Sequence, residues 1–283
     1  MTPPRVGRWL LGAAAVLLLG AAPPAPVYTI EAVRYGTIRN FRTAGLVMGA
    51  DPAERMDIAM VLWLVRGDGR VILVDSGFHR PRWFGSFDFS DYLRPDSALL
   101  EAGVDPADVT DLVLTHAHWD HMGGIDLFPN ATVHLQREEY EYYTGPAWRE
   151  GGRHGGIDEE DILALVRLNI AGKVMLVDGD DTEILPGIRG YTGARHTYAS
   201  QYVLVEGDEP FVLASDNCYL FRNLETHTAG ATFLPEDRAG NEAALRRMAE
   251  LAGSTARVIP GHDPLQFERF PTRGRVARIH APR

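Results

Sequence analysis

The sequence has little cysteine, little positive charge and no repetitive or low-complexity stretch. Its single cysteine, Cys218, excludes an intrachain disulfide and any zinc or iron–sulfur site built on several thiolates. Lys and Arg number 28 against 38 Asp and Glu, which gives a formal net charge of −10 that no long basic stretch offsets. We therefore expect no nucleic-acid partner, because nucleic-acid-binding proteins present a positive surface. Any metal ion must be held by His and carboxylate side chains.

Residues 1–26 differ in composition from the rest of the chain. Arg5 and Arg8 precede an apolar run over 9–22, which is the layout of a signal peptide. The run is shorter than the roughly 20 residues that a membrane-spanning helix needs, and no cysteine follows it to carry a lipid. We expect a leader over 1–26 and a periplasmic or secreted protein, 27–283, with no stable membrane insertion after cleavage.

The chain from residue 27 onward is expected to fold as one α+β domain. Apolar runs bounded by turn residues predict buried strands, and segments with helical periodicity lie between them. Strands are expected at 58–65, 71–74, 109–114, 131–135, 173–177, 187–191, 202–205, 211–214 and 256–259, and helices at 90–102, 158–170 and 237–252. Hairpin-linked strands in each half favour two packed sheets covered by helices. The Arg-rich end, 269–283, is expected to be a solvated surface segment.

The most informative segment directly follows the strand expected at 109–114. It contains the pattern H-x-H-x-D-H, made by His116, His118, Asp120 and His121. A loop that leaves a strand end can direct these side chains at two neighbouring points, so that two cations lie side by side. Neutral imidazoles with a carboxylate suit zinc, manganese or iron better than calcium or magnesium. The segment therefore predicts two divalent metal ions, with Zn²⁺ as the first expectation.

Three further candidate ligands, His196, Asp216 and His262, lie just beyond other expected strands. Alone, each is more simply a capping or hydrogen-bonding residue at a strand end. Loop residues at strand ends converge on one edge of a sheet, however, and the pattern at 116–121 already predicts metal ions there. Together they are candidates for the same metal centre.

With these residues in place, the sequence resembles the metallo-β-lactamase superfamily over nearly all of 27–283. The shared motifs follow in order: V-D-S-G at 74–77, T-H-A-H-W-D-H at 115–121, R-H-T at 195–197, S-D-N at 215–217 and P-G-H-D at 260–263. The resemblance implies an αββα sandwich with a metal pair at one edge of its sheets, and a supporting role behind the metals for Asp75. It also implies the ligands: for the first metal His116, His118 and His196, for the second Asp120, His121 and His262, and between the two Asp216.

The residues around 216 indicate which group within the superfamily the sequence resembles. A bridging carboxylate there argues against the true β-lactamases, and D-N-C-Y at 216–219 is similar to the N-acyl homoserine lactonases. In that group a tyrosine at this spacing donates its hydroxyl to the substrate carbonyl, which implies a catalytic and substrate-binding role for Tyr219; aromatic packing is the alternative. Asp120 is implied as the group that passes a proton to the leaving oxygen. One departure is that Tyr198 and Ala199 replace the usual Pro-Gly after His-Thr.

An aromatic segment at 79–89 supplies the candidate substrate contacts. Trp83, Phe84 and Phe87 lie in a stretch punctuated by Pro and Gly, which can close over an apolar acyl chain. A loop pinned to the core by its rings is the alternative.

The leading hypothesis is a dinuclear metal-dependent hydrolase that opens the lactone ring of N-acyl homoserine lactones or cleaves a related ester. A second hypothesis keeps the metals but changes the bond: a β-lactamase-like amidase, or a thioester or phosphodiester hydrolase on the same fold. A third is a non-enzymatic metal-binding protein. The expected partner is a small molecule with an apolar acyl chain, and the sequence does not decide between a monomer and a homodimer.

Overall fold

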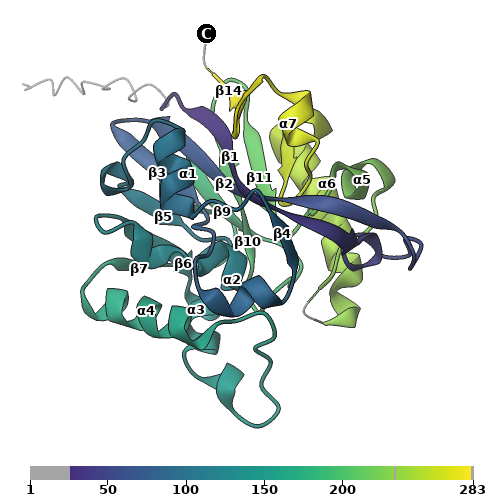
Figure 1. Cartoon of the computed structure of the whole chain (residues 1–283), viewed down its shortest axis with the longest axis horizontal. Coiled ribbons are helices and arrows are strands. Elements are labelled where there is room, and N and C mark those ends of the chain that lie inside the picture. Colours follow the sequence, from purple (N-terminus) through teal and green to yellow (C-terminus); the bar gives the residue numbers. More distant parts are fainter. Residues whose placement is uncertain (1–25, 233, 282–283) are drawn as a thin grey trace, which may run out of the picture.

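The computed structural model describes residues 26–232 and 234–281 (Figure 1). All of the expected leader except Pro26 lies outside these residues, so the leader stays an expectation. Within the described ranges, none of the helices combines the length and the apolar character that crossing a membrane requires.

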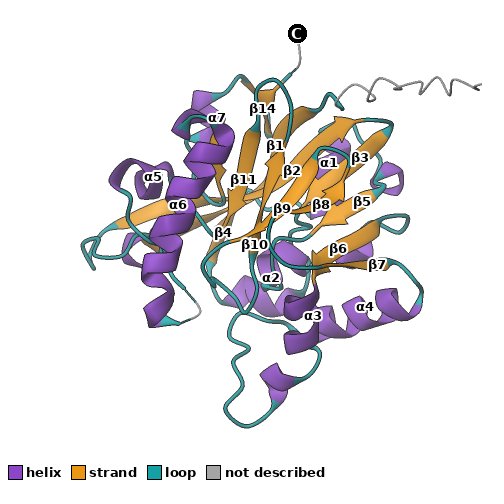
Figure 2. Ribbon diagram, turned by 180° about the vertical axis from the view of Figure 1, so that it is seen from behind, coloured by secondary structure: helices purple, strands orange, loops and turns teal. Residues whose placement is uncertain are grey.

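Two β-sheets face each other at the centre of the molecule, with helices on their outer sides (Figures 1 and 2). Within the described residues the first sheet has nine strands in the order β13-β14-β1-β2-β3-β5-β6-β7, with β4 also paired to β1. These strands are β1 (Thr29–Arg42), β2 (Arg55–Gly67), β3 (Arg70–Val74), β4 (Asp88–Ser90), β5 (Asp111–Val113), β6 (Thr132–Gln136), β7 (Val174–Val177), β13 (Thr272–Arg273) and β14 (Val276–His280).

The second sheet has the order β12-β11-β10-β9-β8. Its strands are β8 (Thr182–Leu185), β9 (Ile188–Thr192), β10 (Gln201–Val205), β11 (Phe211–Ser215) and β12 (Val258–Pro260). The helices are α1 (Pro95–Glu101), α2 (Trp119–Met122), α3 (Arg137–Tyr143), α4 (Glu159–Ile170), α5 (Phe221–Thr226), α6 (Arg238–Ala252) and α7 (Gln266–Arg269).

Strand β2 shows why the layers stack as they do. Met60, Leu62 and Leu64 point to the core under α1, α3 and α4, whereas Val61 and Trp63 point to the core between the sheets. Side chains alternate between the two faces of a strand, so a continuous apolar run is buried on both sides. On the far side, α6 packs against the second sheet. The layers are therefore helix, sheet, sheet and helix, which confirms the expected αββα sandwich.

Most expected elements are present close to their expected bounds. The helix expected at 158–170 is α4, and Asp158 caps it by accepting a hydrogen bond from the Glu160 backbone N–H at 3.0 Å. The helix expected at 90–102 was placed too early. Ser90 belongs to β4, and the helix begins only at Pro95, which favours the first helical turn.

The expectation of a solvated end over 269–283 was wrong for β14, whereas residues 271–274 are exposed as expected and 282–283 lie outside the described residues. Strand β14 pairs with β1 in the first sheet, and Ala277 and Ile279 are buried between the two sheets. Strand β1 itself was not expected, because irregularities between Arg34 and Gly36 and between Ile38 and Phe41 break its alternation. The two omissions are connected, since β14 has no place in the sheet without β1.

Candidate metal centre

The candidate ligands lie in loops that leave strand ends at one edge of the two sheets, except Asp120 and His121, which lie in the short helix α2 directly after such a loop. Strand β5 runs into the loop of His116 and His118, and β9 and β10 flank the loop of His196. Asp216 follows β11, and His262 follows β12, which runs parallel to β11. The structure brings all seven side chains named from the sequence into two neighbouring groups, within each of which the candidate ligand atoms lie within 4.8 Å of one another.

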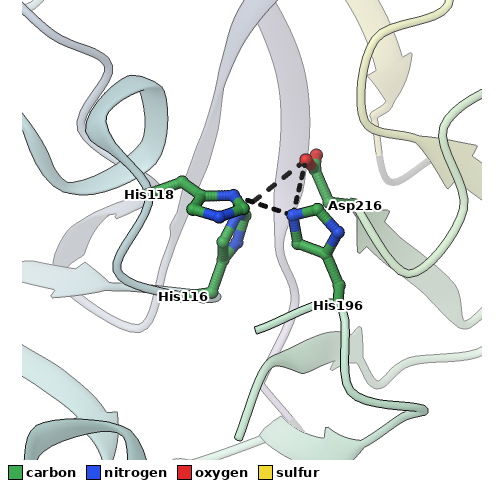
Figure 3. Close-up of side chains that lie close together, drawn as sticks. All are labelled: His116, His118, His196 and Asp216. Atoms are coloured by element: carbon green, nitrogen blue, oxygen red, sulfur yellow. Dashed lines mark hydrogen bonds and ion pairs between the residues drawn. The ribbon is translucent and has the colours of Figure 1, made fainter. Parts of the chain in front are cut away.

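The first group joins three imidazoles and one carboxylate (Figure 3). His118 Nδ1 lies 3.1 Å from His116 Nε2 and 2.8 Å from His196 Nε2. Asp216 Oδ2 lies 3.2 Å from His196 Nε2. Three nitrogens and one oxygen therefore converge on one point.

The second group lies on the other side of the Asp216 carboxylate. Asp120 Oδ2 is 3.6 Å from His121 Nε2 and 3.7 Å from His262 Nε2. Asp216 Oδ1 is 3.2 Å from His121 Nε2 and 3.0 Å from His262 Nε2. Asp216 thus offers one oxygen to each group, which is the arrangement of a carboxylate that bridges two cations.

Two buried atoms between the groups show that the site fits a metal. His121 Nε2 and Asp216 Oδ1 make no hydrogen bond within the described residues, although they lie 3.2 Å apart. Buried polar atoms without a partner are costly, and a cation would serve both. Imidazole nitrogens with carboxylate oxygens are also the donors that zinc-like divalent ions prefer. The residues present therefore fit two divalent metal ions.

The outer ring nitrogens of four histidines are held by hydrogen bonds, which directs their Nε2 atoms at the site. A partner on Nδ1 fixes the tautomer and the ring orientation of a metal-binding histidine. The partners are Thr115 Oγ1 for His116 at 2.9 Å, Asp75 Oδ2 for His121 at 2.8 Å, Tyr219 Oη for His196 at 2.9 Å and the Ala59 carbonyl for His262 at 2.9 Å.

Asp75 connects this support to both sheets. Its carboxylate is fully buried and accepts hydrogen bonds from the Thr115 backbone N–H at 2.8 Å and the Ser215 hydroxyl at 3.1 Å, besides its contact with His121. Asp75 adopts a φ of 65° and Ser215 a φ of 46°, backbone conformations that residues other than glycine rarely adopt. Such backbone conformations cluster at functional sites, where the surrounding packing maintains them.

The electrostatics of the two groups differ. Burial, together with the neighbouring imidazoles, lowers the pKa of His116 and His118 well below the usual range. Burial acts the same way on His121, but the carboxylates of Asp216 and Asp120 override it and raise the pKa of His121 well above the usual range. His116 and His118 are therefore neutral, the form that binds metal, whereas the carboxylates of the second group favour positive charge, which a cation supplies.

Residues 61–262 match the metallo-beta-lactamase superfamily. The chain belongs to this superfamily. It is 33% identical over 174 residues to the N-acyl homoserine lactonase AttM of Azorhizobium caulinodans, which covers 59% of this chain and 63% of that protein. An N-acyl homoserine lactonase of a Bacillus species is 26% identical over 228 residues, covering 75% and 84% of the two chains. The match to this chain thus covers 63% of the full length of AttM, which is less than two thirds of it.

Solved structures of lactonases agree with the observed layers. A quorum-quenching N-acyl homoserine lactone lactonase superposes with a TM-score of 0.70 at 21% identity, covering 86% of this chain and 95% of that one. A dizinc quorum-quenching lactonase in complex with its product superposes with a TM-score of 0.61 at 17% identity, covering 84% and 88%. These likenesses confirm the metallo-β-lactamase fold predicted from the motifs.

The aromatic segment at 79–89 packs against Trp119, which follows the loop of His116 and His118. Trp83 and Phe87 both stack on Trp119, with ring centroids 4.8 Å and 5.5 Å away, and Phe84 contacts Phe78 at 5.2 Å. Trp119 sits between His118 and Asp120 in the sequence. The rings therefore pin the segment to the site as the packing alternative supposed. Trp83 and Phe87 remain half-buried and Phe84 exposed, so contact with a substrate stays a prediction.

One residue that the sequence did not reveal contacts both segments that carry the histidines of the first group. Glu139 of α3 is fully buried and accepts hydrogen bonds from Ala117, Thr197 and Ala199. These partners are 22, 58 and 60 residues away along the chain, so no local pattern marks Glu139.

We expect Gly156→Ala to weaken metal retention by about tenfold, the lower end of the effect of residues that orient metal ligands. A Cβ at Gly156 would lie 2.9 Å from His118 Cδ2, so the methyl group would push the imidazole away. Gly151→Ala is the matched control, because its φ of 78° resembles the 75° of Gly156 but its Cβ would meet nothing within 4 Å. Metal content after dialysis against a chelator is the measurement. Equal retention in both variants would show that the space around His118 does not matter.

Proposed function

We propose that this chain is a metal-dependent hydrolase that opens the lactone ring of N-acyl homoserine lactones. The observation that carries the proposal is the Asp216 carboxylate, which offers one oxygen to each candidate metal group at 3.0 and 3.2 Å. A shared carboxylate holds two cations close together, as hydrolases with two metals require. The similarity to curated N-acyl homoserine lactonases supports the choice of substrate.

Tyr219 lies where it can contact a substrate beside the first group. Its hydroxyl is 2.9 Å from His196 Nδ1, and its ring is buried. If His196 binds metal through Nε2, its Nδ1 keeps a proton and donates it to the Tyr219 oxygen. The hydroxyl hydrogen of Tyr219 is then free for a substrate carbonyl, where it would stabilise the negative charge that develops during attack.

The other catalytic residue of the proposal is Asp120. When bound, the two cations would supply Lewis acidity for attack of water on the ester carbonyl. Opening the ring leaves an alkoxide that needs a proton, and Asp120 is the carboxylate of the second group that is not shared. We assign to Asp120 the uptake of the proton that the attacking water loses and the transfer of that proton to the leaving oxygen.

We propose Zn²⁺ as the resident metal, because the two groups together offer five imidazoles and two carboxylates. For the acyl chain we propose the surface formed by Trp83, Phe84 and Phe87 around Trp119, since these rings are apolar and only partly covered. From the leader expected over 1–26 we propose export to the periplasm or the medium, which amino-terminal sequencing of the exported protein tests.

The decisive experiment measures turnover of a long-chain acyl homoserine lactone and of a β-lactam by the purified protein, with metal content determined in parallel. We expect lactone opening that chelation abolishes and that His118→Ala removes together with the metal. Cleavage of the β-lactam alone would overturn the substrate while leaving the metal centre in place. Two bound metals with neither activity would refute the lactonase proposal and direct the search to other esters and phosphodiesters.

A further inference from the structure

Glu139 is a buried carboxylate that the proposed catalysis does not use. It lies in α3 and has no exposed surface. No ion pair with a basic side chain is found for it among the described residues, and burial raises the pKa of its carboxyl. A buried carboxylate without a cationic partner is costly to fold, so a structure that keeps one must satisfy its oxygens in another way.

Both oxygens of Glu139 accept hydrogen bonds from the loops that carry the first metal group. Oε1 accepts from the Ala117 backbone N–H at 2.9 Å and from the Thr197 hydroxyl at 2.7 Å, and Oε2 accepts from the Ala199 backbone N–H at 2.6 Å. Ala117 lies between His116 and His118, and Thr197 follows His196. One side chain is thus bonded to both loops that supply the three imidazoles of the first group.

The two loops come from different sheets, so nothing in their local sequence sets their separation. The loop of Ala117 follows β5 in the first sheet, and the segment with Thr197 joins β9 to β10 in the second. Helix α3 makes a second contact with this segment, where Tyr142 stacks on Tyr198 with centroids 4.0 Å apart and planes 3° from parallel. Helix α3 therefore contacts a loop of each sheet at the edge that carries the metal ligands and connects the two.

The histidines of the second metal group are oriented by residues other than Glu139. His121 is oriented by Asp75, and His262 by the Ala59 carbonyl. Asp120 and His121 follow the loop of Ala117 directly, in α2, but neither they nor His262 form a hydrogen bond with Glu139 within the described residues. A change at Glu139 should accordingly weaken metal binding at the first group more than at the second.

We propose that Glu139 is a positioning residue for the first metal group, holding the loop of His116 and His118 at the separation from His196 that lets their nitrogens share one cation. The proposal rests on the metal centre described above, and its test reads metal binding rather than turnover. A carboxylate suits this position because three donors converge on two oxygens that carry negative charge. Glutamine keeps the shape but turns an N–H₂ group toward one of the donors.

The test is a titration of the metal-free Glu139→Gln variant with Co²⁺. Binding is measured by calorimetry and by the visible absorption of the bound ion. We expect two binding events in the unaltered protein, and in the variant one of them weakened by about 10–100-fold, as for residues that orient metal ligands. The absorption bands of that site should shift. To identify the site, Glu139→Gln is combined with His118→Ala, where it should have no further effect, and with His262→Ala, where it should weaken the remaining site.

Asp111→Asn is the matched control. Asp111 is also a buried carboxylate, but it begins β5 at the end away from the ligands and bonds to His134 at 2.8 Å and Arg70 at 2.9 Å. We expect it to lower the melting temperature without changing the Co²⁺ bands or affinities. If Glu139→Gln does not fold, Thr197→Val removes one of the three donors and should give a smaller loss at the same site.

Two results would overturn the proposal. One is an unchanged pair of affinities in Glu139→Gln, and the other is an equal weakening of both sites with a fall in melting temperature like that of Asp111→Asn, which would make Glu139 a purely structural residue. Failure of the metal centre itself would be separate and visible, because the unaltered protein would then bind no Co²⁺.

Discussion

Replacing Asp216 with asparagine is expected to leave at most one tightly held metal and to reduce lactone hydrolysis by about 10³-fold or more. The two carboxylate oxygens face different groups, Oδ2 the first and Oδ1 the second. Asparagine offers one oxygen and no charge, so one group loses its shared ligand. Two-metal chemistry contributes several kcal/mol to transition-state stabilisation, and each 1.4 kcal/mol is tenfold in rate. Metal content by elemental analysis and turnover under excess Zn²⁺ are the measurements.

The loss must be distinguished from general damage to the fold. Asp111→Asn serves again, since it removes one buried carboxylate charge at the opposite end of β5. The control should keep both metals and most of its turnover. An Asp216→Asn protein that retained two metals and near-normal turnover would show that the carboxylate does not bridge.

The layered architecture was predictable because its central strands are buried on both faces. Strand β2 carries apolar side chains to the cores on both sides, so its run of residues is visible without knowing the partners. Helix α4 carried both an apolar periodicity and a capping aspartate, Asp158. Such signals lie within one segment, and segments of this kind were placed correctly.

Strands β1 and β14 of the first sheet were not predictable, because their burial depends on pairing between distant segments and not on a pattern within one segment. Strand β1 is broken by irregularities, and β14 gains its burial from pairing with β1, as in the match of Ile30 with His280. Read alone, the end of the chain is rich in arginine and polar. Its burial is decided by a strand about 240 residues earlier, as the bond between Arg275 and Arg34 across 241 positions also shows.

The candidate site divides in the same way. The ligands in the run from His116 to His121 were found by spacing, because a short loop carries them all, and His196, Asp216 and His262 by their position after expected strands. The pairing of ligands into two groups came from the family resemblance and agrees with the geometry. Glu139 escaped both routes, since its importance lies only in contacts that folding creates.

Asp120→Asn is expected to separate metal binding from proton transfer. Asp120 Oδ2 lies 3.6 and 3.7 Å from the imidazole nitrogens of its group, farther than Asp216 Oδ1 at 3.2 and 3.0 Å. Its side chain is also twice as exposed, at 12% against 6%. The carboxylate is thus the less tightly enclosed of the two and the better placed to meet a substrate. Asparagine keeps an oxygen for the metal but cannot carry a proton.

We therefore expect Asp120→Asn to retain two metals while its kcat per bound pair falls by about 10²–10⁴-fold, the range for a positioned proton-transfer group. The matched substrate is an ester whose leaving group is a stable anion, such as a nitrophenolate, because it departs without a proton. On this ester the loss should shrink toward the level explained by metal content alone. An equal loss on both substrates would assign Asp120 to metal binding only, and unchanged turnover of the lactone per metal pair would remove it from the proton path, leaving the leaving oxygen to take its proton from solvent.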